Sequence, residues 1–416
     1  MTVRHIAMVL AGNVVGNAMN LAALLLLAHW LDDSALGVYG TMFFTMVMMS
    51  ALTDFGINTT IVKYYREAEE SGRPDEAESL LRASLWVRLA AIGAIAIPGM
   101  IFAGPLAAWL FKKPEFAHML RLICLGALGG SAWMFSQGAM QARRQFNRYA
   151  TITASNHALR LAAFCALAWA GRLSVNSALI ATIAVPFIGA AGAFALFPDR
   201  FWSARIDPAR LRERVVTILH LSKWVFLSTI IVSIMVWLSV YLLNRYSTEA
   251  ELGQYTNALN IAQGIHLLTA ALATVLLPNL SVTRSREKML YAMSVTVKSI
   301  PWIAACLAVL IAVVHMGVPY LHGGQYGRSA WVFDLLAISF SIAIVVNPLS
   351  FFCLAFERAR WLTWMNLAQL AIAYVSGRLL IPHFGAIGAG LSSMLIYVFA
   401  LVFMLAAFKK LLRVAK

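Results

Sequence analysis

Positive charge inside otherwise apolar stretches is the chemically informative feature of this sequence. Arg88 and Arg160 in the first half of the chain, and Lys223 and Lys298 in the second, are flanked by long runs of hydrophobic residues. A guanidinium or ammonium group that faces lipid at mid-membrane depth costs about 2.5–3.5 kcal/mol even on the lenient insertion scale. We therefore expect these side chains to face a hydrated cavity or to reach the membrane surface.

Depth within the apolar segment distinguishes Arg160 from the other cations. Arg160 lies about ten residues into its segment, or roughly 15 Å along an α-helix, and Asn156 lies one turn earlier on the same face. Arg88, Lys223 and Lys298 lie closer to a segment end, where a long side chain can reach the headgroups. We predict that Arg160 lines a cavity, and for the other three cations both readings stay open.

A cavity lined by these cations would attract an anionic ligand such as a pyrophosphate or an acidic sugar. We expect the ligand to be bound rather than chemically altered, because the sequence contains no P-loop, Gly-x-Ser-x-Gly, His-Glu-x-x-His or Cys-x-x-Cys pattern. The cysteine spacing matches no metal or redox site. We therefore expect no catalytic residue, metal or cofactor, and read all four cysteines as small core residues: Cys124, Cys165, Cys306 and Cys353.

Asparagines form polar stripes on two of the apolar segments. Asn13, Asn17 and Asn20 recur at helical spacing near the N-terminus, and Asn257 and Asn260 repeat the theme in the second half. Such stripes can line a transport path, and they can also join helices by hydrogen bonds. The two readings are equally compatible with the sequence.

Few carboxylates lie inside apolar segments. Asp54 could bind a coupling proton or Na⁺, or it could pair with Arg88 on the next helix, and we favour the pairing. Asp334 lies near a segment end, where we expect water to solvate it. The pair Asp32 and Asp33 occupies a short turn, and we expect it to cap the following helix.

The composition places the chain in a membrane. It is 61% hydrophobic and 12% charged, with a mean hydropathy of +0.76, whereas soluble domains are about half apolar and one quarter charged. The net charge of +15 would suggest nucleic acid for a soluble protein. Here the basic residues lie in short gaps between apolar runs, where they orient helices and contact anionic lipids, so we predict no nucleic-acid binding.

About twelve segments are long enough to cross a membrane, and basic residues concentrate in alternate gaps, which predicts that both termini are cytoplasmic. The expected fold is therefore an all-α integral membrane protein. The predicted spans are 6–29, 36–62, 83–111, 119–140, 150–171, 177–197, 215–243, 252–280, 291–318, 329–356, 360–381 and 384–408. Pro98, Gly104 and Pro105 predict a kink or an early end in the third.

An internal repeat suggests two homologous halves. Leu36-Gly37-Val38-Tyr39 returns as Leu252-Gly253-Gln254-Tyr255, 216 residues later. Six helices per half would orient both halves alike, so that they are related by an axis along the membrane normal. We predict a six-helix bundle over 1–198, a basic linker over 199–214 and a second six-helix bundle over 215–416.

Several motifs together resemble the Wzx-type polysaccharide flippases of the multidrug/oligosaccharidyl-lipid/polysaccharide (MOP, MATE-like) exporter superfamily. They cover nearly the whole chain in the family's order, and they are the residues 25–39, 53–57, 252–258, 277–281 and 380–389. The resemblance implies a V-shaped pair of bundles around a central cavity. It also implies that the protein flips an undecaprenyl-pyrophosphate-linked oligosaccharide, an O-antigen or exopolysaccharide repeat unit, across the bacterial cytoplasmic (inner) membrane by alternating access.

The partners implied are the polyprenyl-linked glycan and membrane lipids, with a polysaccharide polymerase left open. Two alternatives remain. A multidrug or cation antiporter of the same fold would need lumen carboxylates. A membrane glycosyltransferase using polyprenyl-linked donors would use Asp32 and Asp33 as its acidic pair.

Overall fold

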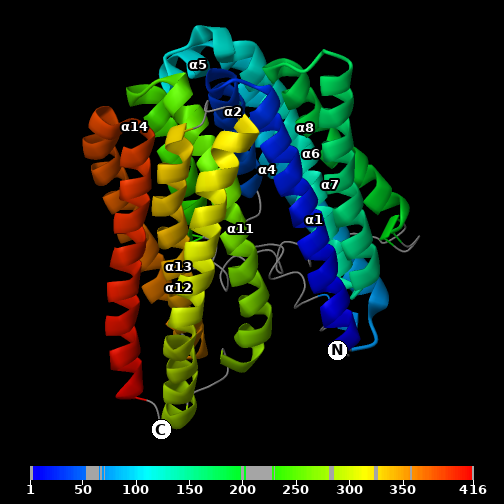
Figure 1. The fold of residues 1–416 in the computed structure, drawn as a ribbon. Coiled ribbons are helices and arrows are strands. Elements are labelled where there is room, and N and C mark those ends of the chain that lie inside the picture. The colour runs from blue at the N-terminus through cyan, green and yellow to red at the C-terminus, as the bar shows by residue number, and fades with distance from the viewer. Residues whose placement is uncertain are drawn as a thin grey trace. The chain divides into compact units, whose positions relative to one another are not determined.

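The structure is a computed structural model, and the part of the chain that it describes is helical, without a β-strand (Figure 1). The described residues are 3–52, 65, 68–69, 71–197, 201–202, 227–228, 230–280, 285–322, 327–356 and 358–414.

The helices of the first half follow the predicted spans closely. Their bounds are α1 Val3–Trp30, α2 Asp33–Leu52, α4 Pro74–Ile101, α5 Ala103–Phe111, the 3-10 turn η1 Pro114–Phe116, α6 Ala117–Ala142, α7 Phe146–Trp169 and α8 Val175–Ala195. The described helices of the second half are Ile230–Tyr246, α11 Glu249–Leu280, α12 Arg286–His322, α13 Gly327–Ala355 and α14 Ala359–Leu412.

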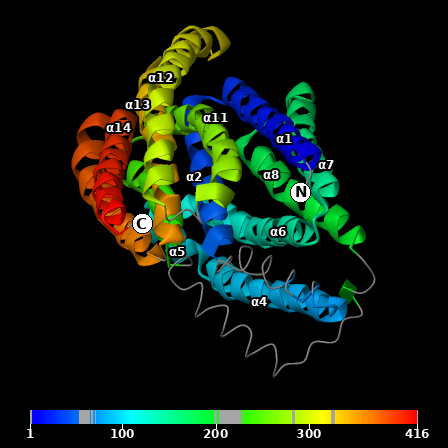
Figure 2. The ribbon, with the colours of Figure 1, turned by 90° about the horizontal axis from the view of Figure 1, so that it is seen from below.

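The chain divides into two compact units. Unit 1 comprises Met1–Ala23 and Thr41–Ser233, and unit 2 comprises Leu24–Gly40 and Ile234–Lys416. In unit 1, α6 packs between α4 and α8, and α7 packs on α8 (Figure 2). In unit 2, α13 packs against α11, α12 and α14. The predicted linker over 199–214 lies almost entirely outside the described residues, so that boundary stays a prediction.

The predicted span 83–111 is wrong at its start, whereas the early end that Pro98, Gly104 and Pro105 predict is confirmed. Its helix, α4, begins much earlier, because Pro74 suits the first turn and Asp75 and Glu76 lie at the positive end of the helix dipole. It ends at Ile101, one turn after Pro98, and α5 follows as a separate short helix with Pro105 in its first turn.

The last two predicted spans form a helical hairpin. The long element α14 is broken at Gly385, whose φ of 55° and ψ of −128° are not helical. The two arms run antiparallel, since the Ser376 and Ser392 hydroxyls lie 2.6 Å apart and the Gln369 amide donates to the Ile396 carbonyl at 3.3 Å. Glycine is needed at the turn because only this residue adopts such a conformation without strain.

Cysteine burial differs from the prediction. Cys124 and Cys353 are buried as expected, but Cys165 and Cys306 are exposed on helix surfaces. In a membrane helix an exposed apolar face contacts lipid, so a small weakly polar side chain is tolerated there as well as in the core.

The two copies of the repeat pack against each other in unit 2. Gly37 lies in the first turns of α2, and Gly253 lies at the equivalent place in α11. A Cβ atom on Gly37 would clash with the carbonyl oxygen of Glu249, and one on Gly253 would clash with the carbonyl oxygen of Asp33. The contact is reciprocal, as expected for two copies of one motif, and both helix backbones approach closely only because neither crossing residue has a side chain.

We predict that Gly253→Ala separates α2 from α11 and lowers stability by about 1–3 kcal/mol, the usual effect of overpacking. Thermal unfolding of the purified protein in detergent measures the loss. Gly264→Ala on the same helix is the matched control, because a Cβ there meets no atom within 4 Å and alanine favours a helix over glycine by roughly 1 kcal/mol. Equal melting temperatures for the two variants would show that the crossing is not tight.

Candidate functional site

Arg160 lies near the middle of α7, where its guanidinium faces α1 and α2. Its Nη1 donates a hydrogen bond of 2.9 Å to Oδ1 of Asn20 on α1. The guanidinium carbon lies 5.3 Å from the centre of the Phe43 ring on α2, which is a cation–π distance. The side chain is half-buried. Three helices of unit 1 therefore hold the mid-membrane cation that the sequence singled out.

The partners of Arg160 are neutral. Asn20 and Phe43 are its hydrogen-bond and ring partners, and no carboxylate of the described residues pairs with it. Its buried Nε makes no hydrogen bond within the same set of residues. The guanidinium thus has no opposite charge beside it among the described residues and has a spare donor, and both features suit an anion.

His157 also belongs to this site, although we did not predict it from the sequence. It lies one turn before Arg160 on α7, is half-buried, and interacts electrostatically with that arginine. Its ring fills the space above Gly16 of α1, where a Cβ atom would lie 3.1 Å from Cδ2. Its spacing of three from Arg160 was a usable signal, since residues three apart share a helix face.

Among the other cations that the sequence singled out, Arg88 belongs to unit 1 with Arg160 but does not join it. Arg88 has no exposed surface and lies between α4 and α6, where its Nη1 donates to the Ser131 carbonyl at 3.3 Å. Lys298 is exposed on α12 in unit 2. Lys223 and Asp54 lie outside the described residues. A shared role of these cations in one cavity therefore stays a prediction.

The asparagines chosen as cavity lining serve mostly as links between helices. Asn156 is buried, and its amide donates to the Val185 carbonyl of α8 at 2.9 Å. Asn257 of α11 donates to the Ser329 hydroxyl of α13 at 3.2 Å, and Asn260 is buried beside it on the same helix. The bonds of Asn156 and Asn257 support the interhelical reading. Oδ1 of Asn257 and Oδ1 of Asn260 are buried without a hydrogen-bond partner among the described residues, and whether any of the three lines a cavity stays a prediction.

Asn13 and Asn17 cannot be assigned in the same way, because their side chains lie outside those that the structure describes. Both belong to α1, on the stripe that contains Asn20. Whether the whole stripe or only Asn20 faces the Arg160 site stays a prediction.

The acidic pair in the first turn caps α2. Oδ1 of Asp32 accepts a hydrogen bond of 2.7 Å from the Ala35 amide, and Oδ1 of Asp33 accepts one of 2.9 Å from the Ser34 amide. Both carboxylates are therefore engaged at a helix N-terminus, as predicted. These contacts support the capping interpretation of the pair over its use as the acidic pair of a glycosyltransferase.

Arg143 of unit 1 is buried and shows the opposite arrangement to Arg160. Arg143 at the end of α6 donates to both carboxylate oxygens of Glu78 on α4, and its Nε–Oε1 distance is 3.0 Å. Its guanidinium also lies 4.2 Å from the centre of the Phe197 ring. Tyr65 donates to the same Glu78 at 2.9 Å, and burial with the nearby carboxylate raises the pKa of its phenol. Arg143 is thus neutralised and structural, whereas Arg160 is not.

Residues 2–284 match the model of a protein family that is described as "Polysaccharide biosynthesis protein". The chain belongs to this family. Among curated proteins, no sequence relative matches the chain.

Solved membrane transporters share the fold of this family member. The lipid II flippase MurJ in an inward closed conformation superposes with a TM-score of 0.78 at 10% identity, covering 96% of this chain and 87% of that one. An inward-facing multidrug resistance MATE family transporter of the MOP superfamily gives 0.79 at 16% identity, covering 95% of each chain. A point mutant of the Vibrio cholerae MATE transporter VcmN gives 0.67 at 16% identity, covering 99% of this chain and 97% of that one.

These likenesses confirm the predicted fold class, an all-α membrane-protein fold like that of these transporters. The composition agrees, because seven of the described helices are long and apolar enough to cross a membrane. The likenesses extend over both halves, although the family model ends at residue 284.

We predict opposite effects on stability for the two buried arginine sites. Glu78→Gln leaves Arg143 buried without its counter-charge and should lower stability by about 3–5 kcal/mol. Arg160→Gln removes a charge that no carboxylate of the described residues balances, so stability should be unchanged or raised. Melting temperatures in detergent distinguish the two. A strong loss for Arg160→Gln would mean that Arg160 is a structural residue.

Proposed function

We propose that this protein is a flippase that moves a polyprenyl-pyrophosphate-linked oligosaccharide across the membrane by alternating access. The observation that carries the proposal is the uncompensated Arg160 at mid-depth of α7. The family is one of polysaccharide biosynthesis proteins, and the fold is one found in a lipid II flippase. Both support a lipid-linked glycan as the substrate.

The chemistry of the Arg160 site suits the pyrophosphate part of such a substrate. A guanidinium presents several donors in a fixed fork that matches phosphate oxygens. Asn20 holds one nitrogen of the fork and Phe43 supports its face, so the group is oriented before a ligand arrives. His157 adds ring nitrogens close by. The pyrophosphate would be held by ionic hydrogen bonds, with no bond made or broken.

The orientation that we propose places both termini in the cytoplasm of a bacterial cell and the protein in its inner membrane. Basic side chains gather at one end of unit 1, where Arg82 donates to the Trp202 carbonyl and Arg148 donates to the Leu196 carbonyl at 3.3 Å. Basic residues favour the cytoplasmic side. The carrier lipid in this membrane would be undecaprenyl, and the acceptor of the flipped unit would be a polysaccharide polymerase.

A multidrug antiporter of the same fold is the second candidate, because MATE transporters superpose equally well. Such a protein needs free carboxylates to bind cationic drugs. Within the described residues, the buried or half-buried Glu78 and Glu251 are each paired with an arginine. Asp334 is paired with His315. These carboxylates therefore have partners, whereas Arg160 has no carboxylate partner among the described residues, which favours an anionic substrate.

We predict that Arg160→Gln lowers the rate of glycolipid translocation about 10- to 100-fold, because a charge-assisted hydrogen bond contributes roughly 1.5–3 kcal/mol. The assay uses proteoliposomes with a polyprenyl-pyrophosphate oligosaccharide and measures how fast the glycan becomes accessible to an impermeant glycosidase. Asn20→Asp should act in the same direction, because a carboxylate beside the guanidinium competes with the ligand.

Control variants are available in and just after the connection between α7 and α8. Arg172→Gln removes an exposed positive charge shortly after the end of α7, and Asn176→Asp adds an exposed carboxylate near the start of α8. Both should translocate normally. Wild-type rates for Arg160→Gln would remove Arg160 from the site. Export of a cationic dye by wild-type protein that moves no glycolipid would favour the antiporter.

A further inference from the structure

A histidine and an aspartate meet inside the membrane-spanning part of unit 2. Nε2 of His315 on α12 lies 2.9 Å from Oδ2 of Asp334 on α13. The two side chains are 32% and 19% exposed, so water or a proton can reach them although both are largely enclosed. The pair corrects the prediction that Asp334 is solvated at a helix end.

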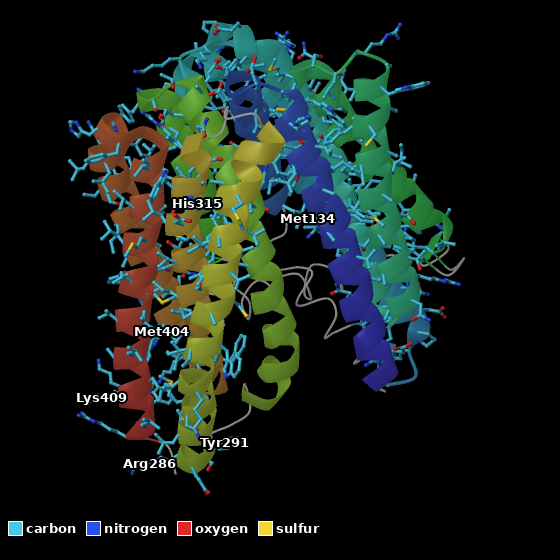
Figure 3. The ribbon with its side chains drawn as sticks, in the orientation of Figure 1. Met134, Arg286, Tyr291, His315, Met404 and Lys409 are labelled. Atoms are coloured by element: carbon cyan, nitrogen blue, oxygen red, sulfur yellow. The ribbon has the colours of Figure 1, made fainter. Side chains whose placement is uncertain are left out.

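The pair lies about two helical turns inside the ends of its helices. His315 precedes the end of α12 at His322, and Asp334 follows the start of α13 at Gly327, each by roughly 10 Å at 1.5 Å per residue. Both residues fall within helices that are apolar enough to span a membrane. Figure 3 shows His315 far along α12 from Arg286 and Tyr291, which lie at the same end of unit 2 as Lys409.

One oxygen of Asp334 is buried without a hydrogen-bond donor from the described residues. This oxygen is Oδ1, the one that does not face His315. A buried carboxylate oxygen that lacks a donor is unfavourable when the group is charged, and protonation of the carboxyl relieves that penalty. The position is therefore suited to hold a proton, and the imidazole on the other oxygen can take or give one.

Other charged or titratable groups on the helices around α13 have partners of their own. Glu251 of α11 pairs with Arg328 at the start of α13, at 2.6 Å, and also accepts from the Ala386 amide of α14. Arg378 of α14 donates to the Tyr374 hydroxyl at 3.1 Å. On α14, Tyr397 meets Phe340 of α13 edge-to-face. The described residues thus offer His315 as the titratable partner of Asp334.

We propose that His315 and Asp334 form a proton-binding site that couples substrate movement to proton movement, an inference that rests on the proposed flippase function. With neutral histidine and ionised aspartate the pair carries one negative charge. One proton taken from water forms an N–H or O–H bond within the pair and makes it neutral overall. A net charge resists movement through apolar surroundings, so the conformational change proceeds with the proton bound, and the proton leaves on the other side.

Trp331 provides a built-in reporter that does not require transport. Its ring meets the His315 ring edge-to-face, with centroids 5.2 Å apart, and a protonated imidazole quenches a neighbouring indole. The Trp331 contribution is the fluorescence of the wild type minus that of Trp331→Phe in detergent. We expect it to fall with one midpoint on acidification. In Asp334→Asn the midpoint should change, because the imidazole loses the carboxylate that it contacts at 2.9 Å.

Proton coupling is measured in proteoliposomes with a pH-sensitive dye inside and a polyprenyl-pyrophosphate oligosaccharide as substrate. Substrate-dependent proton movement should be lost in Asp334→Asn and in His315→Gln, and retained in Arg328→Gln, which breaks the other ion pair of the same helix. Asp334→Asn is nearly isosteric, and His315→Gln provides a second test if that variant folds poorly.

The outcomes separate this proposal from the proposed function. Proton movement at the wild-type level in both variants, with an unshifted Trp331 midpoint, would overturn the proton site while leaving the flippase intact. A wild type that moves no glycolipid would overturn the flippase, whereas the Trp331 titration would still decide whether the pair binds a proton. If the two variants have a lower melting temperature but move protons as the wild type does, the pair only stabilises the contact between α12 and α13, and the proton site is overturned.

Discussion

A charged side chain in an apolar helix needs an opposite charge, water or a charged ligand beside it. This constraint explains how the charged residues are placed in both units of the protein. Arg143 is paired with Glu78 and enclosed by aromatic rings. His315 is paired with Asp334, and Arg328 with Glu251. Arg160 follows none of these solutions, because its partners are an amide and a ring. An anionic substrate is, in our account, the reason why the Arg160 charge is kept at this depth.

Much of the fold could be predicted because apolar segment length and the lack of charge are direct consequences of the membrane. The repeat of Gly37 and Gly253 also pointed to two related halves, and its two copies contact each other reciprocally. Helix ends were harder to predict. The first turns of α4 are charged and read as a loop, yet they are helical because Pro74, Asp75 and Glu76 suit a helix N-terminus in water. Hydropathy indicates which part of a helix contacts lipid, but it does not indicate how far the helix continues into water.

The candidate site was only partly predictable. Depth alone identified Arg160, and the asparagine stripe contained its partner Asn20. Asn156 shares a face with Arg160 by spacing, yet it bonds to α8 and not to α1. Four residues advance a helix by about 40° beyond one full turn, which is enough for one face to contact two neighbours. Which neighbour lies opposite each residue, as for His315 and Asp334, depends on helix packing that periodicity does not encode.

The central claim is that Arg160 binds the diphosphate of a lipid-linked substrate, and the most direct measurement is binding of a polyprenyl diphosphate and of the matching polyprenol to purified protein in detergent. Our account predicts that the diphosphate binds wild type at least about tenfold more tightly than Arg160→Gln, a difference of about 1.4 kcal/mol, and that polyprenol binds both proteins alike. Equal affinity of both proteins for the diphosphate would contradict the account.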